Sequence, residues 1–377
     1  MYKGIYLTLM IGPGVPVPVS QSVIEALTSV QVTTTATSQE PSGFELTFTL
    51  SNRSPLHTLF LVAGGSAIPL VRVILAVTVN GTPQVLIDGV MTNHEVTPGP
   101  EPGQSTLTVM GEDLTRVMDY IDFSGTPYPG MPPEARVLVM LAKYAALGIV
   151  PLVIPSLLSD VPLPTNRIPM QYGTDLRYIR ELAELVGYVF YLEPGPTPGT
   201  TVAYWGPEIK VGGPQPALNI NMDAHTNVET LNFSFNNQSQ TTPVVLIQNE
   251  ATKIMLPIPV PDISLLKPPL GLIPSLPLKV ELLHHTAKLS PLQAAATGAA
   301  EAAKTADTVT GKGSLDVLRY GRVLKARQLV GVRGAGLAFD GLYYVTSVTH
   351  TIKRGEFKQQ FALSRNGLLP TVPRVRA

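Results

Sequence analysis

The stretch TDLRYIRELAELVGYVFYLEPG, from Thr174 to Gly195, decides the fold. Its first half carries apolar residues at the three- and four-residue intervals that form one face of a helix. These residues are Leu176, Ile179, Leu182, Ala183 and Val186. Gly187 then predicts the helix end, and the aromatic run after it indicates a strand followed by a turn rich in proline and glycine. A helix leading directly into a strand predicts an α+β unit.

Two further helices are expected just before this stretch. GEDLTRVMDYIDF (111–123) places apolar residues at helical spacing, with Glu112 and Asp113 in the first turn, where the helix dipole favours anions. PPEARVLVMLAKYAALG (132–148) has a proline at its start and Gly148 after its last apolar residue. We therefore expect residues 111–215 to form a unit of helices and an aromatic hairpin.

The segments on either side of this unit have the pattern of β-structure. In FELTFTL (44–50) apolar residues alternate, and Asn80-Gly81 between two apolar runs is a strong hairpin signal. Residues 1–110 must hide their strand edges, so a small barrel or sandwich is expected. Strand patterns return from residue 216 to 377, with a turn at Lys353-Arg354-Gly355. The predicted fold class is therefore α+β and mainly β.

A proline- and leucine-rich arm and an alanine-rich helix, at about residues 255–310, interrupt the last segment. Proline at this density excludes a central strand and a regular helix, so the arm is expected to be extended and polyproline-like. Its apolar content favours contact with a partner, and the alternative is a loop folded back on its own domain. The candidate interface residues are Pro257, Pro259, Pro261, Leu265, Leu266, Pro268, Pro269, Leu272, Pro274 and Pro277.

Composition excludes several classes of protein. There is no cysteine, so disulfides, thiolate nucleophiles and cysteine-based metal sites are excluded. No run reaches the roughly 18 apolar residues of a membrane span, and Gly12 and Pro13 interrupt the short N-terminal apolar run, which disfavours a secretory signal. Only 14% of residues are charged and the formal net charge is zero, which indicates surfaces buried against partners. The basic residues after 301 lack the interleaved aromatics of a nucleic-acid platform.

Motifs for catalysis or cofactor binding are not found. The six histidines lack the spacing of helical metal ligands, and His284-His285, adjacent on a strand, point to opposite faces. No nucleophile elbow, P-loop or dinucleotide fingerprint occurs. We therefore expect no metal, no cofactor and no enzyme activity.

Two alternative functions are kept open. Glu181 and Glu184 could serve a cell-wall-degrading enzyme, although both belong to the exposed side of their helix, whereas a general acid needs burial. The hairpin aromatics could form a glycan-binding platform, although cross-strand aromatic pairs ordinarily stabilise a hairpin. These aromatics are Tyr188, Phe190, Tyr191, Tyr204 and Trp205.

The chain resembles the phage late control gene D proteins, the baseplate hub family of contractile tails and extracellular contractile injection systems, which includes the N-terminal part of VgrG spikes. The resemblance runs from about residue 5 to 368. It is carried by GPGVPVP (12–18), FELTFTL (44–50), LTVMGEDLTRVMD (107–119), YPGMPPEARVLVMLAKYAALGI (128–149), GTDLRYIRELAELVGYVFYLEPG (173–195) and GLYYVTSVTHTIKRGEFKQQFALSRNG (341–367).

This resemblance implies a homotrimer in which each chain carries two tube-like barrels, residues 1–110 and 216–377, around the α+β insertion. Six barrels would adapt a threefold spike to a sixfold inner tube and nucleate tube assembly. The implied partners are other copies, the spike protein, the inner tube protein and baseplate wedge or adaptor proteins, with no direct contact to nucleic acid. VgrG-type chains continue into a spike, so here the spike is expected to be a separate polypeptide. Assembly is expected in the bacterial cytoplasm, as part of a phage tail or an extracellular injection particle.

Overall fold

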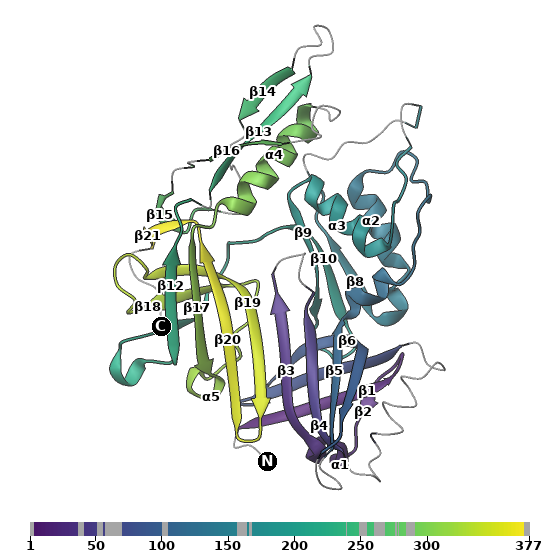
Figure 1. The fold of residues 1–377 in the computed structure, drawn as a ribbon, viewed down its shortest axis with the longest axis vertical. Coiled ribbons are helices and arrows are strands. Elements are labelled where there is room, and N and C mark those ends of the chain that lie inside the picture. Colours follow the sequence, from purple (N-terminus) through teal and green to yellow (C-terminus); the bar gives the residue numbers. More distant parts are fainter. Residues whose placement is uncertain are drawn as a thin grey trace.

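The computed structural model describes most of the chain. The described residues are 4–36, 41–50, 56, 70–99, 105–156, 164–165, 168–238, 240–248, 255–259, 268–275, 277, 279–283 and 291–372. Within them the fold is mainly β, as predicted, with the three longest helices lying toward one end of a large twisted sheet (Figure 1).

The large sheet contains strands from both ends of the chain. Those from the first segment are β1 (Ile5–Pro13), β2 (Val17–Pro18), β3 (Leu27–Thr35), β4 (Gly43–Leu50), β5 (Val71–Val79), β6 (Thr82–Thr97) and β7 (Ser105–Asp113). Those from the last segment are β11 (Gln215–Asn219), β12 (Thr230–Phe235), β17 (Val309–Asp316), β18 (Leu329–Arg333), β19 (Gly341–Lys353) and β20 (Glu356–Arg365). Their order is β12-β17-β20-β19-β3-β4-β7-β6-β5-β1-β2, with β18 on β19 and β11 on β18.

The two halves of this sheet have the same strand order. If the two-residue β2 is left out, the first half runs β1-β5-β6-β7-β4-β3 and the second runs β11-β18-β19-β20-β17-β12. Numbered from one to six in chain order, both halves read 1-4-5-6-3-2. One difference remains, because β1 and β5 are antiparallel whereas β11 and β18 are parallel. The chain therefore contains two copies of one strand order.

Pairing between β3 and β19 joins the two halves. Ser29–Thr35 lies antiparallel to Ser347–Lys353, and the Thr33 and Thr349 hydroxyl oxygens are 3.0 Å apart. The edge of β19 that pairs with β3 pairs with β18 over its first residues. β18 lies along Gly341–Tyr344 and β3 along Ser347–Lys353. Residues more than 300 positions apart thus lie side by side at the centre of the sheet (Figure 1).

Two closed barrels are not found, because no sheet is closed within the described residues. To close the first half, β3 would have to pair with β1, but the second edge of β3 is occupied by β19, and α1 (Gln21–Ala26) precedes β3. The alternation seen in the sequence holds: Phe44, Leu46, Phe48 and Leu50 of β4 are all buried. Buried residues of both halves form one continuous core.

The segment between the halves combines helices with a small separate sheet and has a core of its own. It contains α2 (Pro133–Ala142), β8 (Ile149–Val153), α3 (Asp175–Leu185), β9 (Tyr188–Pro194) and β10 (Thr201–Pro207). The Thr174 side chain caps α3 by accepting a hydrogen bond from the Arg177 backbone N–H, and Gly187 follows its end with φ of 70°. The predicted apolar face of α3 packs into the core of this unit.

The first helix expected in the insertion differs from the prediction. Leu114–Asp119 forms a short 3-10 helix, and Ile121 lies beyond it with 59% of its surface exposed. Asp113 is the N-cap rather than a first-turn residue, and its side chain accepts from the Thr115 N–H at 3.0 Å. The strand β7 ends at the same residue, so the 3-10 helix follows the strand with no connecting loop.

The arm is built differently from the expected polyproline segment. It contains β14 (Met255–Pro259), β15 (Gly271–Pro274), β16 (Lys279–Leu283) and the predicted alanine-rich helix, α4 (Pro291–Thr305). Both β14 and β16 pair with β13 (Thr241–Gln248), which precedes the arm. The prolines are tolerated because β14 is an edge strand of the sheet β14-β13-β16, and β15 pairs only with β21 (Gly367–Pro370). The arm and α4 lie at one end of the molecule, beyond the large sheet (Figure 1).

Candidate functional surface

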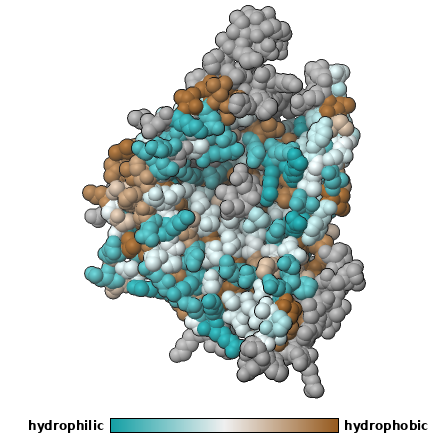
Figure 2. Space-filling view, viewed as in Figure 1, coloured by the Kyte–Doolittle hydropathy of each residue, from teal (hydrophilic) through white to brown (hydrophobic). Residues whose placement is uncertain are grey.

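One face of the large sheet is polar and spans both halves. Along its strands hydroxyl and amide side chains alternate with buried apolar residues, which point into the common core behind them. The polar residues include Gln31, Thr33, Glu45, Thr47, Lys312, Ser314, Ser347, Thr349 and Gln360, which are all exposed or half-buried. Figure 2 shows a broad hydrophilic to neutral surface in the same view as the sheet. This face offers hydroxyl and amide groups together with charged side chains such as Glu45 and Lys312 across both halves.

Two strand edges of this sheet carry no strand partner within the described residues. Beyond Val90, β6 pairs only with β7, so its other edge is free from Met91 to Thr97. The strand β12 pairs only with β17, so its outer edge is free along Thr230–Phe235. Free edges present unpaired N–H and C=O groups and are where another strand can add.

A buried histidine lies beneath the polar face at the junction of the halves. His350 of β19 is 4% exposed, and its Nδ1 is 3.1 Å from the Gln359 amide nitrogen. The Gln359 side chain also accepts from the Leu324 N–H and donates to the Leu324 carbonyl. Burial lowers the pKa of His350 to about 4. His350 is thus a buried, neutral residue with a structural role.

This histidine should make stability depend on pH. The unfolded chain binds a proton below about pH 6.5, whereas folded His350 stays neutral until about pH 4, so the stability it confers falls as the pH decreases between these values. We expect it to account for a loss of about 2 kcal/mol between pH 7 and pH 4.5. Urea unfolding at both pH values should show this loss in the native chain and not in His350→Gln. Equal pH dependence of the two proteins would contradict this assignment.

Arg327, just before β18 in the second half of the sheet, forms hydrogen bonds to the first half and to the insertion. Arg327 Nε donates to the Thr35 carbonyl at 2.9 Å, and Nη1 donates to the Leu192 carbonyl of β9, also at 2.9 Å. Its guanidinium carbon lies 3.9 Å from the centroid of the Tyr191 ring. Burial lowers the pKa of Arg327, and the same cause raises the pKa of Tyr191 to about 12. The hairpin of the insertion therefore has a fixed position on the sheet.

A second buried contact holds the turn of the same hairpin. Arg72 of β5 and Asp88 of β6 form two hydrogen bonds of 2.7 Å, and their side chains are 6% and 0% exposed. Arg72 also donates to the Gly199 carbonyl at 3.2 Å, and the Thr201 hydroxyl donates to Asp88 at 3.3 Å. Neither residue belongs to a sequence motif, so this ion pair could not be predicted from the sequence.

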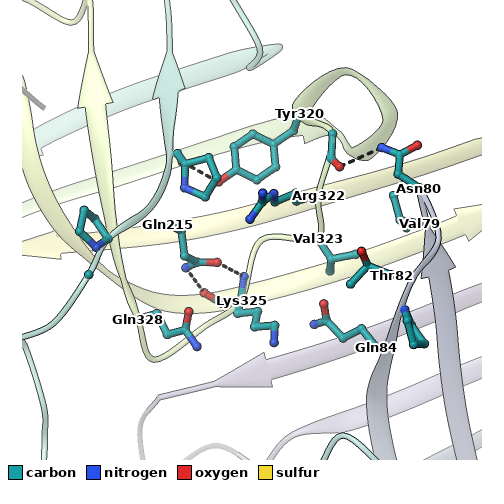
Figure 3. Close-up of a pocket in the computed structure, with 15 residues that line it drawn as sticks. Val79, Asn80, Thr82, Gln84, Gln215, Tyr320, Arg322, Val323, Lys325 and Gln328 are labelled. Atoms are coloured by element: carbon teal, nitrogen blue, oxygen red, sulfur yellow. Dashed lines mark hydrogen bonds between the residues drawn. The ribbon is translucent and has the colours of Figure 1, made fainter. Parts of the chain in front are cut away.

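A cavity of about 670 Å³ with a mixed lining lies between the β5–β6 hairpin, the start of β11 and the loop after α5 (Val317–Tyr320). Figure 3 shows Gln84, Lys325 and Gln328 around the same space, and the Gln215 amide binds the Lys325 backbone at both its N–H and its carbonyl. Arg322 and Lys325 are exposed, and none of the residues that line the cavity is acidic or a histidine. The cavity has no acid–base pair for catalysis.

The carboxylates considered for a cell-wall-degrading enzyme do not form such a site. Glu181 is ion-paired with Arg177 at 2.9 Å on the exposed side of α3, and Glu184 is exposed. Arg180 of the same helix is half-buried, burial lowers its pKa, and its Nε has no hydrogen-bond partner among the described residues. Burial raises the pKa of Asp113, but this carboxylate is committed to capping by its bonds to Thr115.

The hairpin aromatics mostly face inward. Trp205 is fully buried, its Nε1 donates to the Ile179 carbonyl at 3.3 Å, and its ring meets Tyr188 edge-on at 5.0 Å. Tyr191 stacks on Tyr204 across the strands, also at 5.0 Å. The predicted packing role is thus confirmed for Trp205, which is not available to a glycan on the surface of this fold.

The predicted interface residues of the arm fall into three groups. Pro261, Leu265 and Leu266 lie outside the described residues, as does the pair His284-His285, and Pro257 and Pro259 belong to β14. Pro268 is half-buried, and Leu272 is 61% exposed. Pro269, Pro274 and Pro277 are exposed. Nearby Ile273, Val280 and Leu282 are also exposed apolar residues. The described part of the arm thus exposes apolar side chains on two short strands.

No described helix is both long and apolar enough to cross a membrane. Among the described residues no group of three or more His, Asp or Glu side chains could hold a metal ion.

Comparison with solved structures identifies the fold class as that of phage tail proteins and related secretion proteins. A tail protein from Neisseria meningitidis superposes with a TM-score of 0.63 and 13% identity, over 97% of this chain and 98% of that one. The 43 kDa tail protein of prophage MuSo2 from Shewanella oneidensis gives 0.61 and 14%, over 96% and 98%.

The third comparison connects the fold to secretion systems. An Escherichia coli component of the type VI secretion system, itself described as similar to the T4 tail proteins gp27 and gp5, gives a TM-score of 0.53 and 12% identity. This alignment covers 93% of the present chain and 75% of the other. No protein-family model and no curated protein sequence matches the chain. The structural neighbours are those that the resemblance predicts, and at these identities they establish the fold.

Proposed function

We propose that this protein is a structural baseplate hub of a contractile injection machine. Three copies form a ring of six sheet units that adapts a threefold spike to a sixfold inner tube and nucleates the tube. The observation that carries the proposal is the repeated 1-4-5-6-3-2 strand order within one chain. Two equivalent units in each of three chains present six similar surfaces to a tube, while the chains themselves have threefold symmetry.

Three other features support this function. The fold is shared over nearly the full length with phage tail proteins. The polar face is continuous across the joined halves, as a surface lining a common channel requires. The hairpin and α3 of the insertion pack against the sheet through buried contacts and therefore act as a brace.

The remaining assignments extend this proposal. Residues 1–110 and 216–377 are the two tube-like units, and residues 111–215 are the insertion. The exposed apolar residues of the arm contact a baseplate neighbour, and the protein acts without enzyme activity, cofactor or direct nucleic-acid contact. The spike, the inner tube and wedge or adaptor proteins are its other partners, in a particle assembled in the bacterial cytoplasm.

The hub function predicts a stable trimer of the 40.3 kDa chain. Light scattering after size exclusion should give three chain masses, and the protein should not degrade peptidoglycan. A persistent monomer that clears cell-wall substrate, with loss of activity in Glu181→Gln, would favour the enzyme instead. Retention of a monomer on glycan would favour a binding module.

A further inference from the structure

The fifth strands of the two halves, β6 and β19, are equivalent in detail. In β19 the register against β20 shifts between Val345 and Ser347, and in β6 the register against β7 shifts between Met91 and Asn93. Before the shift each strand pairs on its other edge with the fourth strand of its half. After the shift that edge of β19 pairs with β3, whereas the same edge of β6 has no strand among the described residues.

The second strands, β3 and β12, are equivalent as well. SVQVT (29–33) and TLNFS (230–234) share a hydroxyl, aliphatic, amide, apolar, hydroxyl pattern, and both pair with the third strand of their half at equivalent positions. The second edge of β3 is occupied by β19. The second edge of β12 has no strand in the described part of the chain. Each half thus has one edge on its fifth strand and one on its second strand that can pair with another half. Within the chain only β19 and β3 form such a pair, and the equivalent edges of β6 and β12 stay without a strand partner among the described residues.

We propose that β6 of one copy pairs with β12 of the next, in the register that β19 and β3 use within the chain. This inference rests on the proposed ring and names the surface that closes it. Transfer of the β19–β3 register gives antiparallel pairs of His94 with Phe235, Glu95 with Ser234, Val96 with Phe233, and Thr97 with Asn232.

The side chains on both edges fit this pairing. On the core side, Val96 and Phe235 are 39% and 40% exposed, and the junction covers both. On the polar side, Ser234 donates its hydroxyl to the Glu95 carboxylate, at the place where Thr33 and Thr349 meet within the chain. Polar residues therefore meet on the polar face, and on the core side Val96 meets Phe233 while His94 meets Phe235, much as His350 meets Val32 in the internal junction. Because the two edges differ, the contact is head-to-tail. Such a contact forms a closed ring when the rotation that relates one copy to the next returns to the first copy, here after three steps.

Cysteine pairs test the register directly, because the chain has no native cysteine. In Glu95→Cys/Ser234→Cys, oxidation should link chains into dimers and closed trimers. Thr33→Cys/Thr349→Cys should link within one chain and serves as the internal standard. Glu95→Cys/Asn232→Cys, displaced by two residues on the same face, should give about tenfold less cross-linking because its geometry does not suit a disulfide.

Charge substitution tests the buried side of the same junction. Val96→Lys/Phe235→Lys should weaken self-association about 100-fold or more, because each lysine is buried without a partner. Circular dichroism of the monomer should be unchanged, since both positions are exposed in the single chain. Leu337→Lys, at a site that is 85% exposed between β18 and β19, should leave the association unchanged and is the matched control.

The outcomes separate this inference from the hub proposal. Light scattering could show a trimer in which the cysteines at positions 95 and 234 do not cross-link, or a trimer that the two lysine substitutions do not weaken. Either result overturns the β6–β12 junction and leaves the proposed ring intact. A chain that stays monomeric at all concentrations and gives no cross-link overturns the trimer itself. Equal cross-linking in the displaced pair overturns the register.

Discussion

Replacing Asp88 with asparagine is expected to lower the free energy of unfolding by about 3–5 kcal/mol. The substitution leaves the Arg72 guanidinium buried without its counter-charge, because the two side chains are 6% and 0% exposed and meet at 2.7 Å. The same change weakens the contact to Gly199 and Thr201, which fixes the turn of the β9–β10 hairpin against β5 and β6. Urea unfolding of the full chain measures the effect.

Two controls define the cause of this loss. The double variant Arg72→Met/Asp88→Leu should recover most of the stability, since an apolar pair of similar volume needs no charge compensation. Arg116→Ala should cost less than about 1 kcal/mol, because its pair with Asp119 is 40% and 36% exposed. A loss in Asp88→Asn no larger than in Arg116→Ala would show that the buried pair does not support the fold.

Replacing Trp205 with alanine is expected to cost about 3–5 kcal/mol, through lost burial and the cavity that remains. The indole is fully buried between α3 and β9, and its hydrogen bond to Ile179 is lost as well. Trp205→Phe should cost less, because it refills part of the volume. Thermal unfolding measured by circular dichroism gives the comparison.

The matched control for this prediction is Tyr172→Ala, at a ring that is 66% exposed, which should change stability by less than about 0.5 kcal/mol. A Trp205→Ala protein with native stability and lost glycan retention would support the glycan-binding alternative. Native stability with unchanged assembly would show that the insertion does not brace the sheet.

Local structure was predictable wherever one residue type dictates the backbone. Asn80 and Gly81 adopt φ of 50° and 79°, which suits the two-residue hairpin turn. Gly355 does the same between β19 and β20, with φ of 84°. The apolar face of α3 and the alternation in β4 also follow from spacing alone. The alternation in β4 also determines which of its side chains lie on the polar face.

The arrangement of the strands was not predictable from local pattern. Nothing in Thr33 or Thr349 indicates that they meet across 316 positions of chain, and this pairing is what leaves the first half open. The expected first-turn role of Asp113 failed because the strand ends at that residue. Arg327 shows no signal in the sequence, since its partners are backbone carbonyls of two distant segments. The equivalence of SVQVT and TLNFS becomes visible only when the strand order aligns them.

Electron microscopy of the isolated assembly, viewed along its symmetry axis, tests the hub most directly. Three chains, each with two sheets of the same order, should produce an annulus of six similar lobes around a central channel. The polar face should line that channel. An annulus with three lobes, or with the shared sheet facing outward, would contradict the proposal that one chain imitates two tube subunits.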